Sequence, residues 1–408
     1  MKLSIGTHTV EITEPERRNE CSEDKEVQDS TISKQTVERV VAKLKNRKAP
    51  GLDGISNELL KYGGDALTDE MQALFNKIYN KTKVPEQWKQ SITIPIFKKG
   101  EKMDPQNYRG ISLLSAPSKV FTKILAEEIT QTGISEEQQG FRQNRSTIDA
   151  MFTLRQIVEK AIEYNKVAFM CFIDLTQAFD RVRLCDVLKL LKDRNLNPKT
   201  IDIIKEMNIG NSTFIKANNK LSNKIPVATG IRQGDSLSPI LFNLLMDKII
   251  MEVKTAGKGY KMGKKEFKII CYADDAVIIS EDEDNLQKLL YRFEKAAKEL
   301  NMVISVQKTK SLTISREPRR CKLAIYNKSV EQVMSFKYLG VNITSDRNIK
   351  EEVRTQAVAA ARVSGYLRDV IWRNKHMSIE GKTRIYKTCV RPIMTYATET
   401  RAEEEQLK

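Results

Sequence analysis

Two adjacent carboxylates, Asp274 and Asp275, lie between two apolar runs, 267–271 and 276–279. Runs of this length with β-branched and aromatic residues are typical of buried strands, so the pattern predicts a strand, an acidic turn and a second strand. Two neighbouring negative charges at such a place need a compensating partner such as a cation. The stretch indicates metal-assisted chemistry, although the acidic pair alone also fits a polar hairpin turn.

A third carboxylate, Asp174, ends another apolar run, 167–173. If this run pairs beside the acidic hairpin in one sheet, three carboxylates meet at one edge and repel one another unless divalent cations lie between them. Two Mg²⁺ ions about 3.5–4 Å apart would neutralise the carboxylates and stabilise both the attacking and the leaving oxygen of an in-line phosphoryl transfer. We therefore expect a two-metal site here.

The elements that must position these carboxylates follow from the periodicity of apolar residues. Helices are expected over about 36–44, 56–62, 68–81, 118–129, 148–164, 240–253 and 283–300, and from 349 onward. Strands are expected over 91–97, 167–173, 303–306, 311–314 and 336–343. Ser238 before Pro239 has the form of an N-cap followed by proline at the first helical position. The uneven segregation of strands and helices favours an α+β fold.

The charge of the chain limits its partners. It has 408 residues, with Lys+Arg 69 against Asp+Glu 53 and a formal net charge of +16. Such an excess favours a polyanionic partner, with nucleic acid as the leading candidate and a merely basic soluble protein as the alternative. The six cysteines are scattered without a C-x-x-C pair, so neither a zinc site nor a disulfide framework follows from them, and a reducing compartment fits.

Targeting segments are not expected. Residues 1–10 lack the apolar core of a signal peptide, and no apolar run approaches the roughly 18 residues of a membrane span. We expect a soluble intracellular protein of the nucleus or cytoplasm, without membrane contact. Residues 1–30 are polar and acidic without apolar periodicity, which predicts a disordered tail.

Several blocks occur in a fixed order along the chain: KAPGLDGI (48–55), IPIFKKG (94–100), NYRGISLL (107–114), QGFR (139–142), FIDLTQAFDRV (172–182), GIRQGDSLSP (230–239), YADD (272–275) and FKYLGV (336–341). In this order they resemble the reverse transcriptases of non-LTR (LINE-type) retrotransposons, within these an RTE-like group. The resemblance implies a right-hand fold of fingers, palm with an antiparallel sheet, and helical thumb. It places the fingers at 31–165, the palm at 166–345 with a connecting segment at 191–230, and a partial, truncated thumb at 346–408.

The resemblance also implies roles for single residues around the metals. Asp174, Asp274 and Asp275 match the metal ligands, with Asp274 the more direct of the pair, and the carbonyl of Leu175 matches a backbone contact to metal. Lys308 matches the lysine that protonates the leaving pyrophosphate. Its alternatives are Lys310 in the same role and a surface lysine without one.

A second set of residues matches the nucleotide and template contacts. Phe179 matches the bulky side chain that leaves no room for a 2′-hydroxyl, with plain core packing as the alternative. Gln233 and Gly234 match the loop beside the nucleotide, or are a simple loop before a helix. The residues that match cationic contacts are Lys98 (or Lys99) and Arg109 for the triphosphate, and Lys48, Arg142 and Arg145 for the template backbone. The two finger lysines could equally belong to a solvated basic loop.

The resemblance implies an RNA-directed DNA polymerase that uses an RNA template, a DNA primer, dNTPs and two Mg²⁺ ions, for which Mn²⁺ could substitute. Two alternatives stay open. One is a catalytically inactive retrotransposon-derived fragment that binds RNA or an RNA–DNA hybrid. The other is an RNA-binding intron maturase of the same superfamily, which the LINE-type blocks disfavour.

Overall fold

The apolar runs around the acidic residues form the centre of a five-stranded sheet. The computed structural model describes residues 32–401 except positions 219, 233 and 347, so the predicted tail at 1–30 lies outside the described residues. Across the sheet the strands are β14 (Glu331–Gln332), β11 (Lys310–Ile314), β3 (Ala168–Ile173), β10 (Asp275–Ser280) and β9 (Ile269–Tyr272). Strands β11 and β14 are parallel, and the other neighbours are antiparallel.

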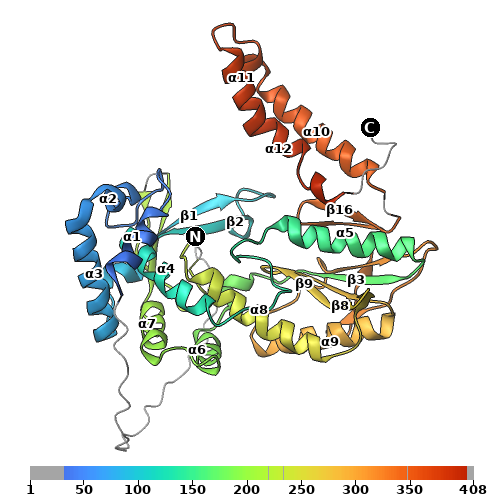
Figure 1. Cartoon of the computed structure of the whole chain (residues 1–408), viewed down its shortest axis with the longest axis horizontal. Helices are drawn as coiled ribbons and strands as arrows, with labels where there is room; N and C mark the ends of the chain where they lie inside the picture. The colour runs from blue at the N-terminus through green and yellow to red at the C-terminus, as the bar shows by residue number, and fades with distance from the viewer. Residues whose placement is uncertain (1–31, 219, 233, 347, 402–408) are drawn as a thin grey trace, which may run out of the picture.

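Both faces of this sheet are covered, which explains the uninterrupted apolar run of β3. Phe169, Cys171 and Ile173 face a core shared with helices α8 (Ser238–Thr255) and α9 (Glu283–Glu299). The alternate residues Ala168, Met170 and Phe172 face a second core, shared with α5 (Thr147–Glu163). Figure 1 shows α5 across one face and α8 and α9 across the other. A strand buried on both sides has no polar face, so its side chains cannot alternate in character.

A second sheet lies among the first half of the helices (Figure 1). Its strand order is β2 (Tyr108–Leu113), β1 (Gln90–Phe97), β4 (Ser212–Ala217) and β5 (Lys220–Leu221), with β6 (Ile225–Pro226) pairing to β4. The helices around it are α1 (Lys34–Ala42), α2 (Asn57–Tyr62), α3 (Gly64–Lys81), α4 (Ala116–Thr130), α6 (Leu184–Asp193) and α7 (Pro198–Asn208). Segment 191–230 therefore adds strands to the sheet that contains the β1–β2 hairpin.

Three further hairpins complete the strands: β7 (Tyr260–Met262) with β8 (Lys265–Phe267), β12 (Ala324–Ile325) with β13 (Lys328–Ser329), and β15 (Ser335–Tyr338) with β16 (Val341–Thr344). The last replaces the single strand expected at 336–343. Leu339 and Gly340 both have positive φ, as a two-residue hairpin turn requires. Phe336 of this hairpin stacks on Phe172 of β3, with ring centroids 4.4 Å apart.

Two sequence expectations are wrong in detail. Segment 303–306 is not a strand, because Ile304 makes only an isolated bridge to Leu175 while Ser305 N donates to the carbonyl of Asp174 at 2.8 Å. Ser238 is the first residue of α8 rather than its N-cap. The chain is already helical at Leu237, whose amide donates to Asp235 Oδ1 at 3.3 Å, so the aspartate turns the backbone before the serine is reached. The mixture of helices and antiparallel strands confirms the α+β class.

The last part of the chain forms a helical arm that projects from the two sheets (Figure 1). It contains α10 (Lys350–Tyr366), α11 (Ile379–Ile385) and α12 (Arg391–Met394), with π-helical turns at Arg368–Trp372 and Tyr386–Val390. Across the described residues, no helix is both long and apolar enough to span a membrane.

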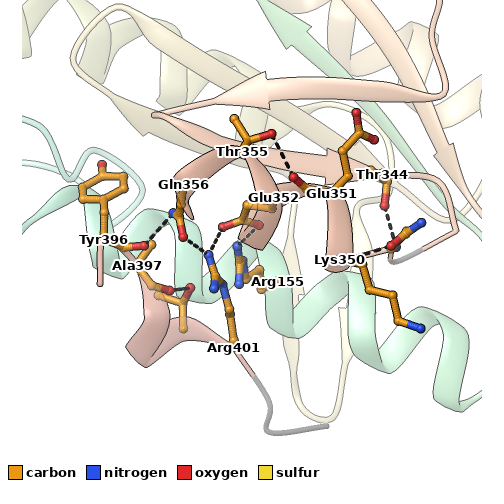
Figure 2. A network of polar contacts seen from close by, with 12 residues as sticks. Arg155, Thr344, Lys350, Glu351, Glu352, Thr355, Gln356, Tyr396, Ala397 and Arg401 are labelled. Carbon is orange, nitrogen blue, oxygen red and sulfur yellow. Dashed lines mark hydrogen bonds and ion pairs between the residues drawn. The ribbon is translucent and has the colours of Figure 1, made fainter. Parts of the chain in front are cut away.

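A buried ion cluster joins the base of this arm to α5, as Figure 2 shows. Glu352 of α10, 4% exposed, accepts from Arg155 Nη2 of α5 at 2.5 Å and from Arg401 Nη2 at 2.6 Å. Arg401 also donates to Gln356 Oε1 at 2.6 Å, and Gln356 donates to the Tyr396 carbonyl at 3.0 Å. Removing one partner of such a cluster leaves the other charges buried without compensation.

We expect Glu352→Ala to lower the free energy of unfolding by about 3–5 kcal/mol, because it leaves two arginines beside a cavity without an anion. Urea denaturation followed by tryptophan fluorescence measures the change. The exposed neighbour provides the control, since Glu351→Ala should change the stability by about 0.5 kcal/mol or less. Equal denaturation midpoints for the two variants would contradict a stabilising role for the cluster.

Candidate active site

The acidic turn lies at one end of the first sheet. Tyr272 of β9 pairs with Asp275 of β10, so Ala273 and Asp274 are the two turn residues. Ala273 has a φ of 57°, in the left-handed region that residues other than glycine rarely adopt. The predicted order of strand, acidic turn and strand is confirmed.

Asp174 follows the last residue of the neighbouring strand. Ile173 pairs with Ala276, so the same antiparallel register continues to Asp174 opposite Asp275. The backbone of Asp174 is held from the next loop, because its amide donates to Thr309 Oγ1 at 3.3 Å and its carbonyl accepts from Ser305. Three carboxylates from distant segments therefore meet at one end of the sheet.

The electrostatics of this end are unfavourable for three negative charges. Loss of hydration raises the pKa of Asp274, and the charge of Asp174 adds to this, whereas the charge of Arg109 opposes it. Partial desolvation, followed by the charges of Asp274 and Asp174, raises the pKa of Asp275 to about 6. Nearby positive charge therefore offsets the repulsion among the three carboxylates only in part.

The donor chemistry fits a hard divalent cation. Asp174 Oδ2 is buried and accepts no hydrogen bond from the described residues, and Lys308 Nζ lies 3.5 Å away. A buried carboxylate oxygen without a hydrogen-bond donor, beside two further carboxylates, is an oxygen-only set of the kind that Mg²⁺ binds. In the part of the chain that the structure describes, no three or more His, Cys, Asp or Glu side chains form a group that could hold a metal ion as they stand.

Cationic side chains approach the carboxylates from two sides. Arg109 extends from β2, and its charge acts on Asp274. Lys308, 70% exposed, approaches from the loop after α9, while its rival Lys310 is bound to the Gln307 carbonyl at 2.5 Å and to Glu331 at 2.6 Å. Of the two lysines, only Lys308 is paired with one of the three carboxylates.

Lys98 and Lys99 are exposed directly after the end of β1. The amide of Lys98 donates to the Asn107 carbonyl at 2.8 Å, which extends the β1–β2 hairpin beyond its last strand pair. Both lysines therefore lie at the tip of the hairpin that carries Arg109.

Phe179 lies in a row of three aromatic rings. It stacks on Phe242 of α8 at 4.4 Å, and its ring meets that of Phe141 edge-on at 6.0 Å. Phe141 is 45% exposed and has a φ of 58°, an uncommon backbone conformation for a bulky residue. One face of the Phe179 ring is thus packed in the core against Phe242. Phe141, which the sequence analysis did not identify, lies at the exposed end of the row.

The loop before α8 approaches β2 closely. Gly234 has a φ of 116°, and a Cβ at this position would lie 2.5 Å from the Ser112 carbonyl oxygen. Gln233 lies outside the described residues. Arg232 anchors the loop through a bond from Nη1 to the Trp88 carbonyl at 2.7 Å. The glycine is therefore required for contact with the β1–β2 hairpin.

Two of the predicted template contacts bind within their own loop. Arg142 donates to the Ser135 and Gln138 carbonyls at 3.0 and 3.1 Å and pairs with Glu136, to which Arg145 is also paired. Lys48 is exposed in the segment after α1. The structure thus gives the two arginines a role in closing the loop, which charge alone did not reveal.

Two buried polar residues at the acidic turn were also missed. Gln138 and Asn243 are both fully buried and bond to the backbone around Ala273 and Gly140. Gln138 directly precedes the QGFR block, but nothing in the sequence distinguishes it from Gln139.

Comparison with known proteins gives one consistent family. The family model for reverse transcriptase (RNA-dependent DNA polymerase) matches residues 96–343. The chain is 26% identical over 391 residues to the RNA-directed DNA polymerase from mobile element jockey of Drosophila melanogaster, covering 90% of this chain and 41% of that protein. It is 27% identical over 313 residues to the Retrovirus-related Pol polyprotein from type-1 retrotransposable element R2 of Nasonia vitripennis, covering 72% of this chain and 30% of that protein.

The chain therefore spans less than half the length of these two curated relatives. Among solved structures, apo telomerase from Candida tropicalis truncated from the C-terminal domain aligns with a TM-score of 0.45 at 12% identity, covering 71% of this chain and 65% of that chain.

We expect Gly234→Ala to displace the loop before α8, because the added methyl group would meet the Ser112 carbonyl and the positive φ would be strained by about 1–3 kcal/mol. Hydrogen exchange of the segments 230–237 and 108–113 should become faster. Gly263→Ala is the control for backbone strain alone, since Gly263 has a φ of 60° with no atom within 4 Å of the added Cβ. Unchanged exchange in the Gly234 variant would contradict the close approach.

Proposed function

Since this chain belongs to the reverse transcriptase family, we propose that it copies an RNA template into DNA by adding dNTPs to a primer 3′-hydroxyl. The observation that carries the proposal is the meeting of Asp174, Asp274 and Asp275 at the end of one sheet, with Asp174 Oδ2 buried and accepting no hydrogen bond from the described residues. Enzymes of this family are generally metal-dependent. The relatives named above are an RNA-directed DNA polymerase from a mobile element and a Pol polyprotein from a type-1 retrotransposable element, whereas membership of an RTE-like group stays a prediction.

We assign the fingers, palm and thumb of the right-hand fold to three successive parts of the chain. The fingers would be 31–165, including the β1–β2 hairpin, and the palm 166–345, including the five-stranded sheet. The thumb would be the helical arm within 346–408, of which 402–408 lie outside the described residues. In this assignment the template and primer would lie between the fingers and the thumb, beside the acidic end of the sheet.

The three carboxylates would hold two Mg²⁺ ions, with Mn²⁺ as a possible substitute and the Leu175 carbonyl as an additional ligand. When bound, these ions supply charge stabilisation at the attacking hydroxyl and at the triphosphate. Asp274 would contribute its carboxylate from the turn, Asp275 from the start of β10 and Asp174 from the end of β3. The raised pKa values of Asp274 and Asp275 support a site that is completed by added positive charge.

The cations around the carboxylates would bind the nucleotide. Arg109, with Lys98 or Lys99 at the hairpin tip, would hold the triphosphate with preorganised positive charge. Lys308 would donate its proton to the leaving pyrophosphate, and its ion pair with Asp174 supports this assignment over Lys310. Gly234, in the loop before α8, would lie beside the nucleotide, and Gln233, which is outside the described residues, would also contact the nucleotide.

Phe179 would lie beneath the sugar and exclude a 2′-hydroxyl. Its stacking on Phe242 supports this role because it prevents the ring from rotating away. Phe141 would form the other wall of the same pocket. Lys48, Arg142 and Arg145 would follow the template backbone, although the bonds of the two arginines within their own loop favour a positioning role for them.

The proposal predicts primer extension by the purified protein on an RNA template with dNTPs and Mg²⁺. Asp274→Asn should reduce the rate by at least about 10²-fold, because it removes a charge that the metals require. Asp284→Asn, an exposed substitution on α9, should retain the rate. Binding of an RNA–DNA hybrid without extension by the unmodified protein would favour the inactive binding fragment over the polymerase.

Phe179→Ala should increase ribonucleotide incorporation relative to deoxynucleotide incorporation by about 10- to 100-fold, since the pocket then has room for a 2′-hydroxyl. Competition between dCTP and CTP at a single template position measures the ratio. The exposed Phe152→Ala on α5 serves as the control. If the ratio is unchanged from that of the unmodified enzyme, Phe179 serves only in core packing and does not select the sugar.

A further inference from the structure

The loop before the QGFR block makes a single β-bridge at the edge of the first sheet. The amide of Cys271 donates to the Glu137 carbonyl at 2.8 Å, and the amide of Gln139 donates to the Cys271 carbonyl at 2.9 Å. Gln138 and Cys271 thereby form a parallel bridge beside β9. Strand β9 is the outer strand of the sheet, so this loop covers the edge that leads into the acidic turn.

The side chain of Gln138 then bonds to the turn itself. Its Oε1 accepts from the amide of Ala273 at 2.9 Å, and its Nε2 donates to the carbonyl of Ala273 at 3.1 Å. The same Oε1 accepts from the amide of Gly140 at 2.9 Å. A carboxamide carries a donor and an acceptor on one plane, so Gln138 satisfies both backbone groups of Ala273 as a neighbouring strand would.

Ala273 is the residue of the turn whose backbone needs such support. Its φ of 57° is strained for a residue with a side chain, and strained backbone persists where its surroundings fix it. Ala273 is only 6% exposed and Gln138 is fully buried, so water does not replace these hydrogen bonds. The geometry of the turn therefore depends on Gln138.

Gly140 and Asn243 add further contacts to the acidic turn. A Cβ on Gly140 would lie 2.2 Å from the Ala273 nitrogen, so only glycine fits against the turn. Asn243 of α8, fully buried, donates from Nδ2 to the Gly140 carbonyl at 2.8 Å. The hydrogen-bonded contacts run from α8 through Gly140 and Gln138 to Ala273, directly before Asp274.

We propose that Gln138 is a positioning residue for Asp274: it fixes the backbone of the acidic turn and thereby the direction in which the Asp274 carboxylate faces Asp174. The inference rests on the proposed polymerase function for its effect on rate, and on geometry alone for its effect on the turn. Substitution of Gln138 removes three hydrogen bonds without touching a substrate, a nucleotide or a metal ligand.

Gln332 offers a matched control at the opposite edge of the same sheet. Its Oε1 accepts from the Cys321 amide at 3.0 Å, and its Nε2 donates to Thr313 Oγ1 at 3.2 Å and to the Arg319 carbonyl at 2.8 Å. Gln332→Met therefore removes the same number of hydrogen bonds as Gln138→Met while leaving the acidic turn intact.

The first measurement is hydrogen exchange of the metal-free protein. Gln138→Met should make the amides of 272–275 exchange at least about 10-fold faster, because Ala273 N–H loses its acceptor, whereas Gln332→Met should leave them unchanged. The second is Mn²⁺ titration followed by electron paramagnetic resonance. Gln138→Met should weaken Mn²⁺ binding by about 10- to 100-fold, the effect of losing a group that orients a ligand.

The third measurement is steady-state primer extension. Gln138→Met should lower kcat by about 10²-fold with the KM for dNTP within about twofold, since a displacement of about 1 Å in a reacting group has an effect of this size. Gln138→Glu, which keeps the length and the acceptor but loses the Nε2 donor, provides a second variant if Gln138→Met does not fold. Gln138→Asn tests whether a shorter carboxamide rescues the turn.

Faster exchange and weaker Mn²⁺ binding in the Gln138 variants alone would support the inference even if the unmodified protein fails to extend a primer. That combination would reject the proposed polymerase activity and keep the positioning role. Equal effects of Gln138→Met and Gln332→Met would overturn the inference, because the loss would then reflect stability alone. Exchange and Mn²⁺ affinity unchanged in the Gln138 variants would overturn it as well.

Discussion

The burial of the five-stranded sheet on both faces is the constraint on which the rest of this structure depends. Apolar side chains from α5 on one side and from α8 and α9 on the other leave no place for a charge within the strands. Charged groups can therefore project only where the strands end. Asp174 directly follows β3, and Asp274 lies in the turn between β9 and β10, so the end of the sheet collects carboxylates that the chain separates widely.

Loops from several parts of the chain then pack against this end. The segment around Ser305 and Thr309 fixes the backbone of Asp174, and the segment around Gln138 fixes the backbone of Ala273. Arg109 brings positive charge from β2, and Lys308 brings it from the loop after α9. The backbones that carry the carboxylates are thus held by hydrogen bonds, while Asp174 Oδ2 accepts no hydrogen bond from the described residues.

Local patterns predicted most of the elements but not the contacts between them. The strand, acidic turn and strand around Asp274 and the strand before Asp174 were predictable because their apolar periodicity is local. The segment 303–306 has the same apolar character, but its partner is the loop after β3, which no local pattern reveals. Gln138 was unpredictable for a related reason: its partner Ala273 is 135 positions away in the chain. The ion pair between Glu352 and Arg155 likewise depends on tertiary packing, so no local pattern predicts it.

The pairing of β3 also affects how the protein is made. Both neighbours of β3, the strands β10 and β11, come much later in the chain, so β3 leaves the ribosome long before either partner exists. At a synthesis rate of about 5–20 residues per second, this uninterrupted apolar strand waits for several seconds without its hydrogen-bond partners. Sheets that close over such long sequence separations fold slowly and expose aggregation-prone segments in the interval. The strand that ends at Asp174 is for this reason also a segment exposed to aggregation during synthesis.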